Sequence, residues 1–284
     1  MRFPRDRERV RASRRYRLRR REERNLEQGE RRARTLGRVW ENRHQARIAV
    51  PSFFTLMNLF CGFVSMVLAS AGNLKMAAVL IVLAALFDTF DGIMARLANA
   101  TSEFGLELDS LSDVVSFGAA PGFLAYHLWL DNLQITGVIL AALPVLCGSV
   151  RLARYNVDNK LTALPYFKGL PIPAQAIILS AFCLLFMGQL EWFDRFEWNI
   201  GSFLVPLITV LSFLMVSTIP FDKIPRLDAK SLRAEKGKAI LFASYLLGIL
   251  VFKEIGLMVA MSLYILKGVV TAVASVFLEP VDPA

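Results

Sequence analysis

Four aspartates stand close together in the stretch DTFDGIMARLANATSEFGLELDSLSD, which begins at Asp88. Asp88 and Asp91 are three residues apart, and Asp109 and Asp113 are four residues apart. On an α-helix either spacing places both side chains on one face. Because only a short connection separates the two helices, we expect them to be antiparallel neighbours whose acidic faces meet. The stretch therefore predicts a cluster of four carboxylates.

Such a cluster needs a positive partner, because even one charged side chain within a membrane costs about 2.5 to 3.5 kcal/mol. Protons, basic side chains or metal ions could supply the charge. Carboxylates without a nearby His or Cys cluster favour hard ions such as Mg²⁺ or Mn²⁺, and two such ions would balance the cluster. Paired metals of this kind serve phosphoryl transfer, whereas ion-coupled transporters also use intramembrane acids. The carboxylates by themselves leave both classes open.

The rest of the chain is strongly apolar, with 55% hydrophobic residues in a length of 284. Runs such as GVILAALPVLCGSV and FLVPLITVLSFLMVSTI offer no polar face to water, which excludes a soluble α/β enzyme. A membrane crossing takes about 20 apolar residues. We therefore expect an all-α polytopic membrane helix bundle. Its predicted helices lie near residues 49–70, 74–98, 106–129, 135–155, 173–190 and 200–219, with two more near 239–252 and 256–278.

Positive charge is concentrated at the beginning of the chain. The net charge is +9, and residues 1–47 hold 18 arginines against 7 acidic residues. The connections 156–172 and 221–238 are also basic. If the helices alternate in direction, both connections lie on the same side of the membrane as residues 1–47, and the positive-inside rule makes that side cytoplasmic. Eight helices would return the C-terminus to this side, and seven would not. The arm either lies on anionic membrane lipids or is a solvated tail.

These patterns predict four regions. They are an Arg-rich cytoplasmic arm (1–47), a transmembrane core (48–220), a basic cytoplasmic loop (221–238) and C-terminal transmembrane helices (239–284). The three cysteines lie inside apolar runs without metal or redox spacing, and the two histidines are isolated. We expect both kinds of residue to be structural.

The aspartate stretch resembles the signature of the CDP-alcohol phosphotransferase family, D-x2-D-G-x2-A-R-x8-G-x3-D-x3-D. Eight fixed positions match: Asp88, Asp91, Gly92, Ala95, Arg96, Gly105, Asp109 and Asp113. The resemblance implies a six-helix core and a dinuclear Mg²⁺ or Mn²⁺ site open to the cytoplasm. In it Asp88, Asp91 and Asp109 would be the principal metal ligands. Asp113 would be a further ligand or the general base that deprotonates an acceptor alcohol.

The resemblance also implies a pocket for the CDP moiety. Gly92, Ala95 and Gly105 would line the cytidine, and Arg96 would lie near the phosphates. Asn58 is a polar residue within the first predicted helix. It either hydrogen-bonds to the nucleotide or ties helices together.

Three further blocks resemble the bacterial and archaeal phosphatidylserine synthase subfamily. They are IAVPSFFTLMNLFCG at 48–62, RLARYN at 151–156 and YFKGLPIPAQA at 166–176. This resemblance implies transfer of a phosphatidyl group from CDP-diacylglycerol to the hydroxyl of L-serine, giving phosphatidylserine and CMP in a bacterial or archaeal cell membrane. It also implies a homodimer, and nothing in the chain points to a nucleic acid.

Serine carries a carboxylate that needs a cationic partner. Arg151 and Arg154, three residues apart, offer bidentate donors, and Asn156 and Lys168 are further candidates. The arginines could equally anchor the helix end or contact phosphate. A sister enzyme using glycerol 3-phosphate or an inositol phosphate and, from another class, an ion-coupled transporter remain the alternatives.

Overall fold

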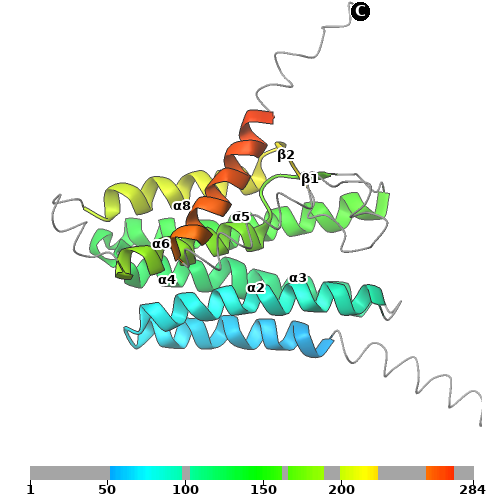
Figure 1. Cartoon of the computed structure of the whole chain (residues 1–284), viewed down its shortest axis with the longest axis horizontal. Coiled ribbons are helices and arrows are strands. Elements are labelled where there is room, and N and C mark those ends of the chain that lie inside the picture. Colours follow the sequence, from blue (N-terminus) through cyan, green and yellow to red (C-terminus); the bar gives the residue numbers. More distant parts are fainter. Residues whose placement is uncertain (1–51, 98–102, 162–165, 189–198, 223–253, 272–284) are drawn as a thin grey trace, which may run out of the picture.

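The computed structural model describes residues 52–97, 103–161, 166–188, 199–222 and 254–271. Within these ranges the chain is a helix bundle with one pair of short strands (Figure 1). The expected all-α membrane bundle is therefore confirmed. The Arg-rich arm, most of the loop 221–238 and the predicted helix 239–252 lie outside the described residues.

The first helix, Ser52–Ser70, and α2, Leu74–Leu97, form an antiparallel hairpin. The turn between them rests on Gly72, whose φ of 79° lies in the left-handed region that glycine adopts at little cost. The Asn73 N–H closes the turn by donating to the Leu68 carbonyl at 2.9 Å. This hairpin places the N-terminal half of the first helix beside the C-terminal half of α2, which carries two of the aspartates.

The next helical run is interrupted where the sequence predicted a continuous helix over 106–129. It consists of α3 (Glu103–Asp113), a π-helical turn η1 (Val114–Ala119) and α4 (Ala120–Leu128). Pro121 lies in the first turn of α4, and it has no N–H to give to the carbonyl four residues earlier. In the preceding turn the Ala120 N–H donates to the Val115 carbonyl instead, the wider π spacing. The π turn begins directly after Asp113.

The remaining helices complete the bundle. After the 3₁₀ turn η2 (Leu130–Leu133) come α5 (Ile135–Leu161), α6 (Ile172–Gly188) and α8 (Gly201–Val216), and the last described helix is Glu254–Thr271. α5 runs six residues beyond its expected end at 155, through the largely polar residues NVDNKL. α5 packs against α8 and the π turn, and α2 packs against α6.

Two short strands near the ends of α5 and α8 were not predicted. β1 (Tyr166–Lys168) pairs antiparallel with β2 (Pro220–Asp222), with Phe167 opposite Phe221. Gly169 follows β1 with a φ of 77°, and its N–H donates to the Ile219 carbonyl at 2.9 Å. The pairing fastens the segment before α6 to the segment after α8.

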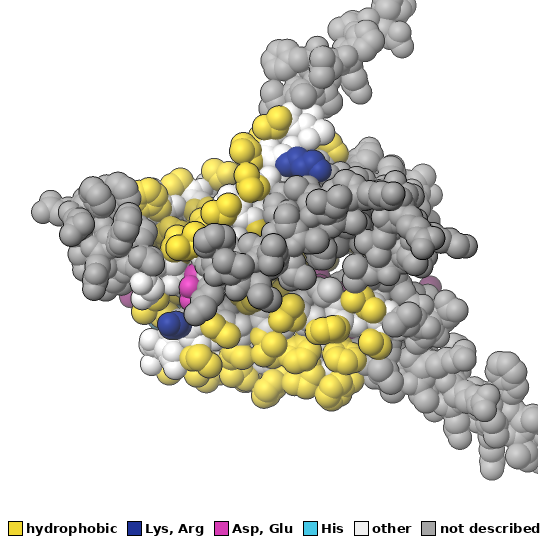
Figure 2. Space-filling model, in the orientation of Figure 1, with side chains coloured by type: hydrophobic (Ala, Val, Ile, Leu, Met, Phe, Trp, Pro, Cys, Tyr) yellow, Lys and Arg dark blue, Asp and Glu magenta, His cyan; other side chains and the backbone are white. Residues whose placement is uncertain are grey.

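The outer surface of the bundle is apolar. Four described helices are long and apolar enough to cross a membrane: Ser52–Ser70, Leu74–Met94 within α2, Ile135–Asp158 within α5, and Glu254–Thr271. Phe53, Phe60 and Phe63 of the first helix are more than half exposed. Hydrophobic side chains dominate the lower part of Figure 2, where the first helix and α2 lie in Figure 1. These features are those of an integral membrane protein.

A close approach between the first helix and the π turn depends on Gly62. A Cβ at this position would lie 2.6 Å from the Ser116 Cα, a backbone atom that cannot move alone. We therefore expect Gly62→Ala to destabilise the protein by about 1 to 3 kcal/mol through overpacking. Thermal unfolding in detergent measures the change. Gly188→Ala is the matched control, because a Cβ there meets nothing within 4 Å; equal unfolding temperatures for the two variants would contradict the prediction.

Candidate functional site

The two acidic faces meet between α2 and α3. Carboxylate oxygens of Asp88, Asp109 and Asp113 lie within 4.8 Å of one another. Asp91 is 8% exposed and lies within electrostatic range of Asp88 and Asp109. The structure thus brings together all four aspartates that the sequence singled out, with three of them forming the tightest group.

The first helix supplies the neutral partners of two of these carboxylates. Thr55 donates its hydroxyl hydrogen to Asp91 Oδ2, and Asn58 Nδ2 donates to Asp113 Oδ1 at 3.4 Å. Thr55 and Asn58 are 3% and 0% exposed, so both hydrogen bonds are shielded from solvent. Asn58 therefore contacts the cluster and also ties the first helix to α3.

Two serines anchor the backbone that carries these partners. Ser112 Oγ donates to the Thr55 carbonyl at 3.0 Å, and Ser116 Oγ donates to the Asn58 carbonyl at 2.9 Å. Sequence reasoning missed Thr55, Ser112 and Ser116. The available signal was spacing, because Thr55 and Asn58 are three positions apart and the two serines are four positions apart, which places each pair on one helix face.

The cluster has the properties of a cation site. All its possible ligand atoms are carboxylate oxygens. One of them, Asp109 Oδ1, is buried and accepts no hydrogen bond from the described residues. Like charges gathered in an apolar bundle repel one another, and a bound cation would offset that repulsion. These residues fit a hard divalent ion such as Mg²⁺ or Mn²⁺, which binds carboxylate oxygens.

Of the four candidates for serine binding, Arg151 is the one that is buried and within electrostatic range of an aspartate of the cluster. It is 7% exposed, and Asp113 is among the groups within its electrostatic range. Its guanidinium carbon also lies 6.0 Å from the centre of the Tyr155 ring. The structure therefore places a buried guanidinium within electrostatic range of Asp113.

Each of the other three candidates also contacts protein groups. Arg154 Nη1 donates to the Val216 carbonyl, the last residue of α8, at 2.9 Å. Asn156 Nδ2 donates to Ser110 Oγ at 3.0 Å, and Lys168 Nζ forms an ion pair with Asp158 at 3.0 Å.

Four of the residues predicted to hold the nucleotide, Gly92, Ala95, Arg96 and Gly105, lie on the same two helices as the aspartates, and Asn58 lies on the first helix. A Cβ on Gly92 would meet nothing within 4 Å, so open space adjoins the backbone directly after Asp91. Gly105 lies on α3 one turn before Asp109. The backbones of Ala95 and Arg96 belong to α2, and their side chains are outside the description.

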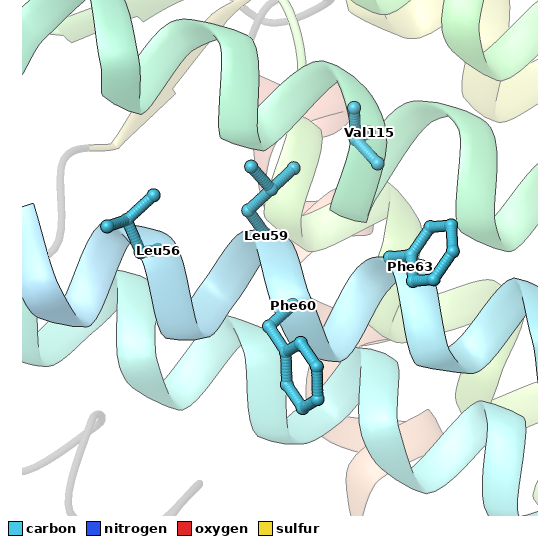
Figure 3. Close-up of a pocket in the computed structure, with 5 residues that line it drawn as sticks. All are labelled: Leu56, Leu59, Phe60, Phe63 and Val115. Carbon is cyan, nitrogen blue, oxygen red and sulfur yellow. The ribbon is translucent and has the colours of Figure 1, made fainter.

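A shallow apolar hollow of about 470 Å³ lies between the first helix and the π turn. Figure 3 shows its lining, with Leu56, Leu59, Phe60 and Phe63 on one helix and Val115 on the other. Leu56 and Leu59 each directly follow a residue that bonds to an aspartate, Thr55 or Asn58. The first helix thus turns a polar face to the cluster and an apolar face to this hollow.

The cysteines and the described histidine take no part in the cluster. Cys61 and Cys183 are buried, and Cys147 is half-buried; all three are free thiols. His127 packs against the rings of Phe123 and Tyr126. The structural roles expected for them agree with these positions, and His44 lies outside the described residues.

Several known proteins are similar to this chain over most of its length. Over 221 residues the chain is 35% identical to the CDP-diacylglycerol–serine O-phosphatidyltransferase of Helicobacter pylori, covering 78% of this chain and 89% of that protein. The enzyme of the same name from Methanocaldococcus jannaschii is 38% identical over 178 residues, 63% of this chain and 76% of that one. The Bacillus subtilis enzyme is 34% identical over 186 residues, 65% and 96% of the two chains. Residues 48–214 match the CDP-alcohol phosphatidyltransferase family, and the chain belongs to that family.

Proposed function

We propose that this protein transfers the phosphatidyl group of CDP-diacylglycerol to the hydroxyl of L-serine, giving phosphatidylserine and CMP. The observation that carries the proposal is the group of three carboxylates within 4.8 Å, formed by aspartates of the family signature. The names of relatives from bacteria and archaea, which include an archaetidylserine synthase, support serine as the acceptor.

In this proposal Asp88, Asp91 and Asp109 would be the principal ligands of two Mg²⁺ or Mn²⁺ ions, and Asp113 beside them would be the general base. When bound, these ions neutralise charge on the diphosphate and on the departing CMP. The excess of negative charge supports this arrangement. Four carboxylates gather at the site, and they outnumber the single positive charge that Arg151 brings near them.

The chemical step is an attack of the serine Oγ on the phosphorus that bears the diacylglycerol. A bond forms between that oxygen and the phosphorus, and the bond from the phosphorus to the bridging oxygen breaks. The bridging oxygen leaves with CMP, and the hydroxyl proton passes to the Asp113 carboxylate. The hydrogen bond from Asn58 keeps one oxygen of Asp113 in place, which suits a residue that must accept a proton at a defined position.

Arg151 is the residue we assign to the serine carboxylate. Its guanidinium is buried near Asp113, so a serine held by Arg151 would present its hydroxyl to the base. A planar guanidinium matches a carboxylate through two parallel hydrogen bonds. The other three candidates would not contact serine. Through the contacts described above, Arg154 holds α8, Asn156 holds α3, and Lys168 holds β1 against α5.

We assign the cytidine to the open space beside Gly92, lined also by Ala95 and Gly105, with Arg96 near the phosphates. Glycine lets the nucleotide approach the helix backbone. The site would face the cytoplasm, as would the Arg-rich arm, which would contact anionic lipids of a bacterial or archaeal cell membrane. We further propose a homodimer.

An assay with purified protein in lipid nanodiscs tests the function. Labelled serine and CDP-diacylglycerol should give phosphatidylserine and CMP, and EDTA should abolish the reaction. Glycerol 3-phosphate and an inositol phosphate serve as competing acceptors in the same reaction. Preference for either of these would reassign the acceptor, and ion flux without CMP release would overturn the enzyme proposal.

A further inference from the structure

We propose that Thr55 is a positioning residue that orients Asp91 toward the metal ions; this inference rests on the proposed metal site. Thr55 lies outside the aspartate signature, on a different helix. Its hydroxyl donates to Asp91 Oδ2, although the two residues are 36 positions apart. A carboxylate has two oxygens, so the contact holds one of them and leaves the other to face a cation.

The contact is buried at both ends. Thr55 is 3% exposed and Asp91 is 8% exposed, so water does not compete effectively for the hydrogen bond. Hydrogen bonds from a hydroxyl to an ionised carboxylate are shorter and about twice as strong as neutral ones. Because Asp91 lies within electrostatic range of Asp88 and Asp109, this bond also restrains a side chain that its neighbours repel.

Thr55 is itself held in place by the helix that carries the other two aspartates. Its carbonyl accepts a hydrogen bond from Ser112 Oγ at 3.0 Å, and Ser112 directly precedes Asp113. Through its hydroxyl and its carbonyl, Thr55 therefore links α2 to α3 beside the cluster. A shift of α2 would disturb the first contact, and a shift of α3 would disturb the second.

Other helical threonines use their hydroxyls differently. The hydroxyls of Thr89, Thr209 and Thr271 donate to the carbonyls of Ala85, Val205 and Lys267, each four residues earlier in the same helix. This local bond is the usual alternative for a threonine within a helix. The Thr55 hydroxyl reaches a carboxylate on a neighbouring helix, which is the behaviour expected of a residue that orients a metal ligand.

The test is direct Mn²⁺ binding to the purified full-length protein, followed by the electron paramagnetic resonance signal of free Mn²⁺. Thr55→Val keeps the shape of the side chain but removes the hydroxyl, and we expect it to weaken Mn²⁺ binding by about 10- to 100-fold. Thr55→Ser keeps the hydroxyl and should bind as the wild type does. Thr209→Val is the matched control, since its hydroxyl bonds within α8.

A double-mutant cycle separates orientation from general loss of structure. In the Asp91→Asn background, Thr55→Val should cause no further loss of Mn²⁺ binding, because the pair acts as a unit. Unchanged binding in Thr55→Val, or equal losses in the Val and Ser variants, would overturn the role of Thr55. Failure of the wild type to bind Mn²⁺ would instead overturn the metal site.

Discussion

Replacement of Asp113 by Asn is expected to lower kcat by about 10²- to 10⁴-fold, the contribution typical of a positioned general base. Asn has nearly the same shape and can still accept the hydrogen bond from Asn58, but its amide cannot take the serine proton. The fold should therefore be preserved while the chemical step is lost. Steady-state kinetics with labelled serine measures the effect.

The control for this variant is Asp131→Asn, which changes an exposed aspartate on η2. It should retain the activity of the wild type. Thermal unfolding in detergent should show that Asp113→Asn folds normally. Activity within about tenfold of the wild type would remove Asp113 from the role of base, since that loss is smaller than such a residue contributes.

Replacement of Arg151 by Lys is expected to raise the KM for serine by about 10- to 100-fold. The estimate corresponds to losing a charge-assisted hydrogen bond worth about 1.5 to 3 kcal/mol. Lysine keeps the positive charge but cannot form the paired contact of a guanidinium with a carboxylate. The KM for CDP-diacylglycerol should change little. The measurement is a serine titration at saturating CDP-diacylglycerol.

Arg154→Lys is the matched comparison, one helical turn along α5. Its guanidinium donates to the end of α8, so this variant should lower the unfolding temperature more than it changes the KM for serine. A rise in the KM for CDP-diacylglycerol in Arg151→Lys would place Arg151 at the phosphates. Serine kinetics altered by Arg154 and not by Arg151 would exchange the roles of the two residues.

The sequence predicted the helices well where apolar length alone determines them. The first helix, α2, α6 and α8 lie within a few residues of their expected limits because the membrane requires a defined apolar length. The expected end of α5 was too early, because apolar length does not limit how far a helix extends through the polar residues that follow. The π turn after Asp113 was not predicted. Pro121 removes one N–H, but its presence in the sequence does not determine whether the helix kinks, ends or widens to π spacing there.

The meeting of the aspartates could also be predicted from the sequence. Spacings of three and four residues define helix faces, and a short connection makes neighbours of the two helices. The signature of eight positions then identified the family without any structure. These are local properties of one stretch, and local spacing is visible in a sequence.

Only the tertiary structure decided which distant residues complete the site. Spacing treated Arg151 and Arg154 alike, whereas packing buries the first near Asp113 and joins the second to Val216. The contact between Thr55 and Asp91 depends in the same way on how the first helix lies against α2. Such contacts join residues dozens of positions apart, and they form only when whole helices pack. The sequence by itself therefore determined the membrane bundle and the acidic cluster, and helix packing determined which side chains orient the carboxylates.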